Sequence, residues 1–171
     1  AAILACLLTL NSAWGAGAVA PDHAMVITEQ SLKHMNLSPG IRYFRDESGD
    51  MSWDGVRLTS ADQWRPIETE IPSFGYDDAA YWFRFSLSNQ SGANFDGLLE
   101  IAYPILDQAQ LFSSSATASA FTTLTLGDNI PFAERPLDHH NFLVAVPLAA
   151  GENQQFYLRV QTESSVQVPL I

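Results

Sequence analysis

The polar side chains best suited to ligand binding stand together in one short stretch, ERPLDHHNF, from Glu134 to Phe142. Arg135 carries a planar fork of donors that matches a carboxylate, and a histidine such as His140 changes its charge near pH 6.5 when unperturbed. Proline and turn residues surround the stretch, which indicates a long loop, and loops on a rigid sheet commonly hold binding residues. We therefore regard Arg135, His140 and Asn141 as candidate ligand-binding residues.

The same loop also has a purely structural interpretation, in which Arg135 and Asn141 bond to backbone groups and hold the loop closed. A metal site is less well supported, because His139 and His140 are neighbours, and adjacent side chains on an extended chain point to opposite faces. The sequence predicts no metal and no other cofactor.

A second candidate site lies in the segment AYWFRF. Tyr81, Phe83 and Phe85 alternate and are expected to face the core, which leaves Trp82 and Arg84 on the opposite face. An exposed tryptophan beside an arginine offers a flat apolar platform and a fork of donors, which suits a sugar ring with its hydroxyls or a carboxylate. The alternative is a cation–π pair under a loop, which only stabilises the fold.

Tyr103 is the remaining candidate, because it ends the strand-like run EIAY directly before Pro104. Proline cannot donate a hydrogen bond to a sheet, so Tyr103 is expected at the rim of the sheet. Its hydroxyl could reach a ligand there, or its ring could fill the rim of the core.

Catalytic motifs are missing from the sequence, which contains no G-x-S-x-G, no H-E-x-x-H and no phosphate-binding loop. The alternating Asp46, Ser48 and Asp50 resemble the start of a calcium loop. Arg57 stands where the bidentate glutamate belongs, however, and a hairpin turn accounts better for the stretch. We therefore predict no catalytic residue, although the spatial separation of a glycosidase carboxylate pair is not readable from a sequence.

The charge of the chain narrows the class of partner. Its 171 residues include 8 Lys and Arg against 19 Asp and Glu, which gives a formal net charge of −11. Such a surface repels nucleic-acid phosphates and anionic lipid headgroups. Nucleic acid is therefore not expected as a partner, and a neutral or cationic ligand or another protein is favoured.

The first residues, AAILACLLTLNSAWGAGA, are typical of a secretory signal peptide whose front is missing. We assign residues 1–18 to that signal and residues 21–171 to a single exported domain. The one cysteine, Cys6, lies inside the signal, so the mature domain is expected to contain no disulfide and no thiolate site. Export without cysteines favours the periplasm of a Gram-negative bacterium.

Short segments that alternate between apolar and polar residues dominate the rest of the chain and predict β-strands, whereas helical spacing appears only at residues 29–37 and around Trp53. A first hairpin is expected from Ile41 through the turn ESGD to a return strand at Met51 and Trp53. Further strands are expected at residues 81–88, 98–102, 107–112, 121–126, 142–146, 155–161 and 166–170. Turn residues separate these strands, so we predict an all-β fold, an antiparallel sandwich with one or two short helical segments.

From Asp77 onward, several ordered motifs carry a resemblance to a known family. They are DDAAYWFRFSLSN, LLEIAYPILDQAQLF and the segment that runs from GDNIPFAERPLDHHNF to QVPL. Together they resemble the type-2 extracellular domain of bacterial seven-transmembrane receptors with diverse intracellular signalling modules. The resemblance implies a jelly roll similar to carbohydrate-binding modules, followed by a seven-helix membrane region coupled to a histidine kinase or a diguanylate cyclase. One departure is His140, where the family often has arginine.

The leading hypothesis is a non-enzymatic periplasmic sensor domain that binds a small ligand, with carbohydrate as the class implied by the resemblance. The predicted site combines Trp82, Arg84, Tyr103, Arg135, His140 and Asn141, which requires the ERPLDHHNF loop and the AYWFRF strand to meet in space. Two alternatives stay open. The domain could form a homodimer or bind another receptor's sensor domain, with Trp82 as the interface anchor, or it could be an accessory module of a carbohydrate-active enzyme. Membrane contact is expected only through the downstream part of a receptor.

Overall fold

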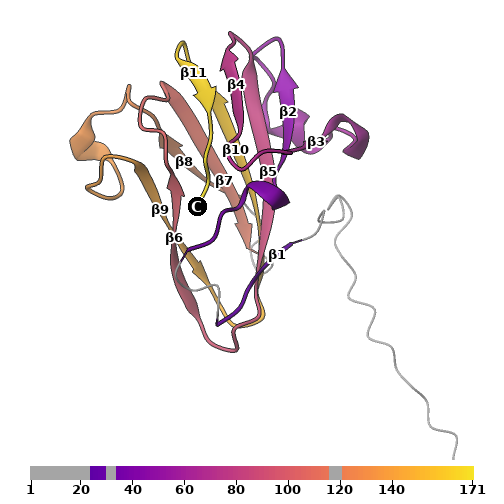
Figure 1. Ribbon diagram of the computed structural model, residues 1–171, viewed down its shortest axis with the longest axis vertical. Helices are drawn as coiled ribbons and strands as arrows, with labels where there is room; N and C mark the ends of the chain where they lie inside the picture. The colour runs from indigo at the N-terminus through magenta and orange to yellow at the C-terminus, as the bar shows by residue number, and fades with distance from the viewer. Residues whose placement is uncertain (1–23, 30–33, 116–120) are drawn as a thin grey trace, which may run out of the picture.

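The structure is a computed structural model that describes residues 24–29, 34–115 and 121–171. The predicted signal peptide lies outside these residues. The described residues form two layers of β-strands around a hydrophobic core (Figure 1). The prediction of an all-β sandwich is therefore confirmed.

The larger layer is a seven-stranded sheet in the order β3–β2–β5–β10–β7–β8, with β1 beside β5. Its strands are β1 (Met25–Ile27), β2 (Arg42–Asp46), β3 (Arg65–Pro66), β5 (Ala80–Asn89), β7 (Gln108–Ser115), β8 (Thr122–Leu126) and β10 (Asn153–Gln161). All neighbours in this sheet are antiparallel except β1, which runs parallel to the end of β5.

The smaller layer consists of two antiparallel pairs, in which β11 pairs with β4 and β6 pairs with β9. The strands are β4 (Ser73–Tyr76), β6 (Phe95–Ile101), β9 (Phe142–Leu148) and β11 (Ser165–Gln167). The residues after β11 join the two pairs. Leu170 forms a bridge with Ile101, and Ile171 exchanges two backbone hydrogen bonds with Glu100, at 2.9 and 3.0 Å.

In the part of the chain that the structure describes, helical structure is limited to one turn of α-helix and three short 3₁₀ segments. These are α1 (Trp53–Arg57), η1 (Ser38–Gly40), η2 (Ala61–Gln63) and η3 (Phe132–Glu134). None of the helices formed by the described residues has the length and apolar composition that a membrane span needs.

The helical spacing around Trp53 is confirmed by α1, but the predicted return strand of the first hairpin is wrong. The side chain of Ser52 accepts a hydrogen bond from the Gly55 amide, and this N-cap starts a helix where a strand was expected. The strand that pairs with the start of β2 is β3. Helical spacing was also noted at residues 29–37. Residues 34–37 of that segment are irregular, and residues 30–33 lie outside the described residues.

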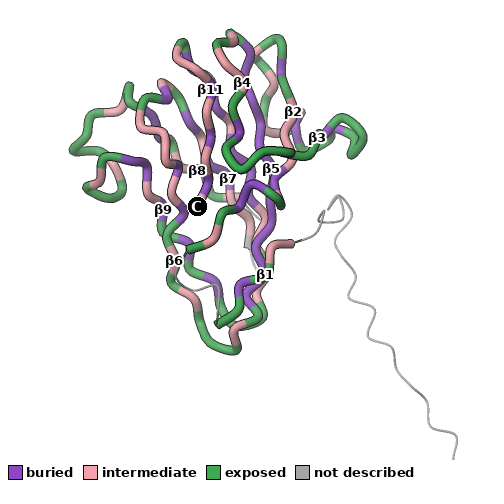
Figure 2. Tube along the Cα trace, viewed as in Figure 1, coloured by how far each residue is buried: buried purple, intermediate pink, exposed green. Residues whose placement is uncertain are grey.

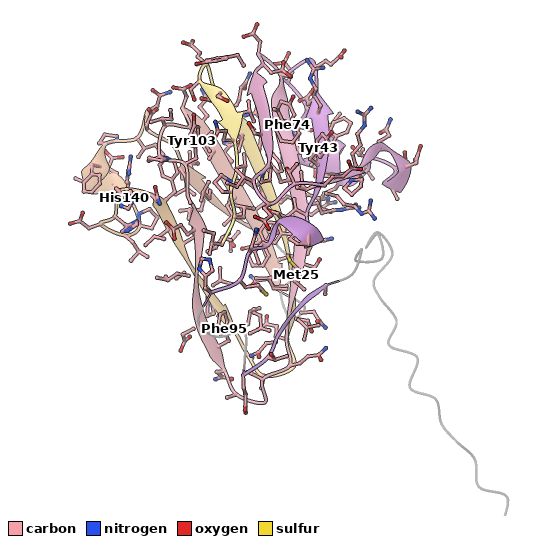
Figure 3. The ribbon with its side chains drawn as sticks, in the orientation of Figure 1. Met25, Tyr43, Phe74, Phe95, Tyr103 and His140 are labelled. Atoms are coloured by element: carbon pink, nitrogen blue, oxygen red, sulfur yellow. The ribbon has the colours of Figure 1, made fainter. Side chains whose placement is uncertain are left out.

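The central strand of the fold is β5, and all ten of its residues are buried (Figure 2). The prediction that Tyr81, Phe83 and Phe85 face the core is confirmed, since all three lie between the layers. Phe85 stacks on Phe156 of β10, with 5.0 Å between ring centroids. At the other end of the strand, Tyr81 packs against Phe74 of β4, labelled in Figure 3, at 4.5 Å.

Asn89, the last residue of β5, ties the two layers together. It is fully buried, and its side-chain amide donates to the carbonyls of Ala93, Leu148 and Ala149 at 2.7, 3.0 and 3.0 Å. Its Oδ1 accepts hydrogen bonds from the amide and the hydroxyl of Ser91. One side chain therefore fixes the turn after β5 and the end of β9 in the opposite layer.

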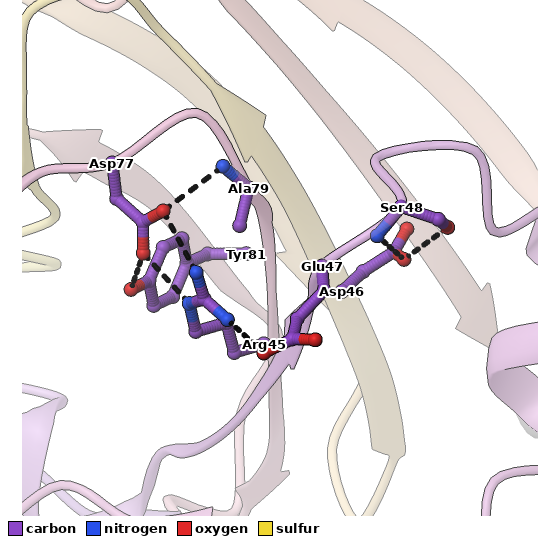
Figure 4. Close-up of polar contacts among 7 residues, drawn as sticks. All are labelled: Arg45, Asp46, Glu47, Ser48, Asp77, Ala79 and Tyr81. Atoms are coloured by element: carbon purple, nitrogen blue, oxygen red, sulfur yellow. Dashed lines mark hydrogen bonds and ion pairs between the residues drawn. The ribbon is translucent and has the colours of Figure 1, made fainter.

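A polar network holds the turn between β4 and β5 against β2 (Figure 4). The guanidinium of Arg45 contacts both carboxylate oxygens of Asp77, at 2.7 and 3.0 Å, and the Tyr81 hydroxyl donates to the same carboxylate at 2.6 Å. The hydrogen bonds from Arg45, and then from Tyr81, hold the pKa of Asp77 well below its usual range. Burial and the bond to Asp77 raise the pKa of Tyr81 to about 12.

The Asp77→Asn variant is expected to have a lower Tm than the parent at pH 7, and the difference is expected to vanish in acid. A carboxyl with a depressed folded-state pKa stabilises the fold above its unfolded pKa, near 3.9, and this stabilisation is lost as the pH falls toward the folded value. Melting curves between pH 7 and pH 2 test this. Asp78→Asn, an exposed neighbour, is the matched control. An equal Tm difference at pH 7 and pH 2 would contradict the conclusion that the ionised Asp77 carboxylate stabilises the fold.

Candidate functional site

Trp82 and Arg84 lie on the outer face of the larger sheet, as predicted, but neither is exposed. Their exposed fractions are 1% and 5%. The segment that contains α1 and η2 covers them and forms an outer aromatic cluster, whose members are Phe44, Met51, Trp53, Val56, Trp64, Trp82, Phe112, Phe121 and Tyr157. The prediction that Trp82 and Arg84 form an exposed platform is therefore wrong.

Arg84 is held inside this cover by stacking and hydrogen bonding. Its guanidinium carbon lies 4.5 Å from the centroid of the Trp64 ring. Burial raises the pKa of the Tyr157 hydroxyl, and the charge and hydrogen bond of Arg84 partly offset that shift. The alternative reading of a purely stabilising cation–π contact is met with a different partner, because the ring beneath the Arg84 guanidinium belongs to Trp64 and not to Trp82. The outer aromatic cluster acts as a second core.

The ERPLDHHNF loop follows η3 and enters β9 of the smaller layer, so it belongs to the other side of the sandwich. Arg135 donates to the carbonyls of His139 and His140, at 3.3 and 3.1 Å. Its guanidinium carbon also lies 5.0 Å from the Phe132 ring centroid and 4.9 Å from that of Phe142. Arg135 thus closes the loop and anchors it to the core residue Phe142.

Asn141 and His139 connect this loop to β6. The Asn141 side chain donates to the carboxylate of Glu100, and the Asn141 amide donates to Nδ1 of His139 at 3.2 Å. The rings of His139 and His140 lie 4.2 Å apart, and His139 rather than His140 faces a cleft beside β6. The sequence analysis selected His140, which does not line this cleft, and did not select His139 or Glu100, which do.

Tyr103 follows β6 and packs, partly buried, against the core between the layers. Figure 3 shows it apart from His140, which lies at the outer edge of the smaller layer. The six predicted site residues therefore fall into three places: Trp82 and Arg84 under their cover, Tyr103 at the core rim, and Arg135, His140 and Asn141 in the loop. The loop and the AYWFRF strand do not form one site.

A cleft of about 400 Å³ lies between β6, the last residue of β1 and the residues that follow β1. We call it the β6 cleft. It is lined by Ile27, His34, Met35, Leu37, Leu87, Phe95, Asp96, Gly97, Leu98, Leu99, Glu100, His139, Leu143, Val146 and Ile171. Pockets of this size with an apolar lining and a few convergent polar groups are the usual form of a small-ligand site.

The polar groups of the β6 cleft come from three separate segments. Asp96 and Glu100 stand on the outward face of β6, His139 comes from the loop, and His34 comes from the chain before η1. Two carboxylates and two imidazoles can accept hydrogen bonds from hydroxyl or ammonium groups. The cleft is therefore suited to a ligand that combines an apolar part with hydrogen-bond donors or positive charge.

The aromatic ring in the cleft is positioned by a glycine. A Cβ atom built on Gly97 would collide with the Phe95 ring, which shows that this ring folds along the inner face of β6 over Gly97. In Figure 3, Phe95 lies between β6 and the N-terminal strand. Glycine at position 97 thus lets Phe95 form part of the cleft wall.

Metal binding has no support in the described part of the chain, where no group of three or more His, Cys, Asp or Glu side chains could hold an ion. The Asp46 carboxylate, which began the partial calcium pattern, accepts hydrogen bonds from the Ser48 amide and hydroxyl and from the Met51 amide. This is the turn expected there.

Comparison with known proteins agrees with this architecture. The family model described as 7TMR-DISM extracellular 2 matches residues 38–171, from η1 through β11 to Ile171. A search of curated proteins found no match. The match includes β6, β9 and the ERPLDHHNF loop, whereas Ile27, His34, Met35 and Leu37 of the β6 cleft precede it. With most of its length matched, the chain belongs to the 7TMR-DISM extracellular 2 family and is an extracellular sensor domain of a seven-transmembrane receptor.

Proposed function

We propose that this domain senses a ligand held in the β6 cleft, on the periplasmic side of an inner-membrane receptor of a Gram-negative bacterium. The observation that supports the proposal is the construction of the cleft, in which five separate parts of the chain converge on one mainly apolar hollow that also contains polar groups. These parts are residues 27–37, Leu87, residues 95–100, residues 139–146 and Ile171. Four of its lining residues precede the family match, so the ligand preference of this chain can differ from that of its relatives.

Carbohydrate is the ligand class that the family resemblance implies, and the carboxylates of Asp96 and Glu100 could accept hydrogen bonds from sugar hydroxyls. The lining is mainly aliphatic, however, with Phe95 as its aromatic ring. A ligand with a substantial apolar portion, such as a deoxygenated or acylated sugar or another amphipathic compound, fits this lining better than a fully hydroxylated one.

We propose that the change caused by ligand binding is transmitted through Ile171. This residue lines the β6 cleft and is paired with Glu100, whose carboxylate also receives the Asn141 side chain. A ligand that binds one arrangement of these groups better than another shifts the equilibrium between them. A histidine kinase or a diguanylate cyclase coupled to the receptor would read that shift.

A thermal-shift screen of the domain against sugars, acylated sugars and small amphipathic cations tests the proposal. A ligand at 100 times its Kd is expected to stabilise the parent by about 2.7 kcal/mol. His139→Ala is expected to reduce the response, because His139 lines the cleft, while its neighbour His140 does not and His140→Ala serves as the matched control.

The Arg84→Ala variant tests whether a ligand binds in the β6 cleft or in the outer aromatic cluster. It is expected to lower the Tm, because Arg84 is stacked inside the outer aromatic cluster, and to leave the ligand-induced shift unchanged. If instead the ligand response disappeared in Arg84→Ala and survived in His139→Ala, the ligand would belong to the outer aromatic cluster and the proposed site would be wrong.

A further inference from the structure

The larger sheet ends at β8, and the outer edge of this strand is open. One side of β8 pairs with β7 throughout its length. Among the described residues, no other strand lies beside β8, and beyond that pairing no backbone hydrogen bond reaches it (Figure 1). Thr122, Thr123 and Thr125 are exposed. β8 lies inside the chain, between β7 and β9, and its free edge presents unpaired N–H and C=O groups to solvent.

Two other edge strands of the sandwich carry features that discourage further pairing. At the opposite edge of the larger sheet, β3 consists only of Arg65 and Pro66. At the edge of the smaller layer, β9 contains Pro147. Short length, charge and proline are common ways to protect an edge. β8 has none of them, because its five residues, TTLTL, include no proline and no charged side chain.

The hairpin that carries β8 is uncharged over its whole length. Residues 108–127 contain no Asp, Glu, Lys, Arg or His, and no other stretch after residue 22 is free of these residues for as long. Two chains of net charge −11 repel each other, and they do so least where neither presents a charge near the contact. The charge distribution therefore favours β8 as the place where two copies of this chain meet.

The sequence of β8 is suited to pairing with itself. An antiparallel pair of β8 strands related by a twofold axis at Leu124 places this residue opposite Leu124 of the second copy. Thr123 then lies opposite Thr125, and Thr122 opposite Leu126. A contact of this kind uses the same surface on both copies, so it closes as a dimer and does not continue into a filament.

The two faces of such a pair match the environments that β8 already has. Leu126 is buried in the core between the layers and Leu124 packs partly buried against it, whereas Thr123 and Thr125 are exposed on the other face. Side chains directly opposite each other share a face, and pairs of threonine hydrogen-bond across strands. Pairing would therefore remove Leu124 further from water and would match threonine with threonine outside.

We propose that β8 is the dimerisation edge of this domain, through which two copies join their larger sheets into one continuous sheet. The occupant is a second copy because the edge complements itself in length, side-chain pairing and charge. A pair of five-residue strands buries little surface, so the contact is weak between free domains. Receptors held in one membrane meet at a raised effective concentration, at which a weak contact suffices.

The first test is sedimentation velocity of the domain between about 10 µM and 1 mM, the range in which weak contacts are populated. The parent is expected to shift from monomer to dimer. Thr123→Glu combined with Thr125→Glu places like charges opposite each other and is expected to weaken dimerisation at least tenfold. Thr123→Glu combined with Thr125→Lys places opposite charges there and is expected to restore it.

A matched control separates a local effect from the effect of net charge. Leu58→Glu combined with Gln63→Glu adds the same two negative charges at exposed positions of the segment that contains α1 and η2. This variant is expected to dimerise like the parent.

The second test is oxidative cross-linking of a cysteine variant, read on a non-reducing gel. The natural cysteine, Cys6, lies in the predicted signal peptide, so Leu124→Cys supplies the cysteine of the mature domain. Residues directly opposite in an antiparallel pair have Cα atoms about 4.5–5.5 Å apart, within the reach of a disulfide. Leu124→Cys is expected to give a covalent dimer. Thr123→Cys faces Thr125 of the second copy and is expected to cross-link far less.

Several outcomes would overturn the inference. A parent that stays monomeric up to about 1 mM, together with no cross-link from Leu124→Cys, excludes the dimer. Association that survives Thr123→Glu with Thr125→Glu, or that Thr123→Glu with Thr125→Lys fails to restore, assigns the contact to another surface. Equal cross-linking of Leu124→Cys and Thr123→Cys contradicts the twofold register. The ligand response of the β6 cleft is tested separately, so the proposed function stands or falls independently.

Discussion

Replacing Trp82 with alanine is expected to lower the free energy of unfolding by about 3–5 kcal/mol, the typical cost of truncating a buried aromatic side chain. The residue is 1% exposed, and its ring lies 5.6 Å from that of Phe112 and 6.5 Å from that of Trp53. Truncation would leave a cavity between β5 and the segment that covers it. Urea denaturation followed by circular dichroism measures the change directly.

Two further variants make the result specific to burial. Trp82→Phe is expected to lose much less stability, because most of the contact surface is kept. Leu58→Ala, on the same covering segment but 83% exposed, is expected to change stability by no more than about 0.5 kcal/mol. Parent-like stability of Trp82→Ala, combined with loss of ligand binding, would restore the platform interpretation that the structure contradicts.

The second large effect is expected at Asn89. Asn89→Ala should destabilise the domain by about 2–3 kcal/mol, because it leaves carbonyl groups at the end of β9 and in the turn after β5 without their donor. These groups lie at the junction of the two layers, where the protein excludes water from the Asn89 side chain. Chemical denaturation again provides the measurement.

The control for Asn89 lies in the same turn. Asn94 is exposed and accepts one hydrogen bond, from the Ala150 amide at 3.3 Å. Asn94→Ala is expected to cost a few tenths of a kcal/mol, because water can replace the lost partner. Equal losses in the two variants would show that the buried amide of Asn89 does not join the layers in the way described above.

The strands were predictable because each strand buries one face, so that apolar and polar residues alternate along it with a period of two. This is why Tyr81, Phe83 and Phe85 were placed correctly in the core. The outer face of β5 was misread because its cover is made by residues distant in sequence, and alternation cannot show what lies over a face. Trp53 and Trp64 were the available signal that this face is covered. Two large aromatic residues in one polar segment need a surface to pack against.

The site was less predictable than the fold. The ERPLDHHNF loop was singled out correctly as a polar loop that enters a strand, but an irregular loop has no periodicity from which to decide whether His139 or His140 faces the β6 cleft. The opposite wall of the β6 cleft comes from residues around β1, which no local pattern connects with β6. For Arg135 the structural interpretation named beside the ligand contact is the one observed, since its guanidinium donates to two carbonyls of the loop.

The order in which strands pair has a consequence for folding kinetics. Among the described pairs, only β2–β3 and β7–β8 join strands that are neighbours along the chain. The pairs β5–β10, β6–β9 and β4–β11 each join strands that are separated by several other strands in the sequence. Chain entropy must be lost before such distant contacts form, so folding is expected to take milliseconds to seconds. During that interval β6 has both edges unpaired, and we expect the repulsion between chains of net charge −11 to oppose their association through these edges.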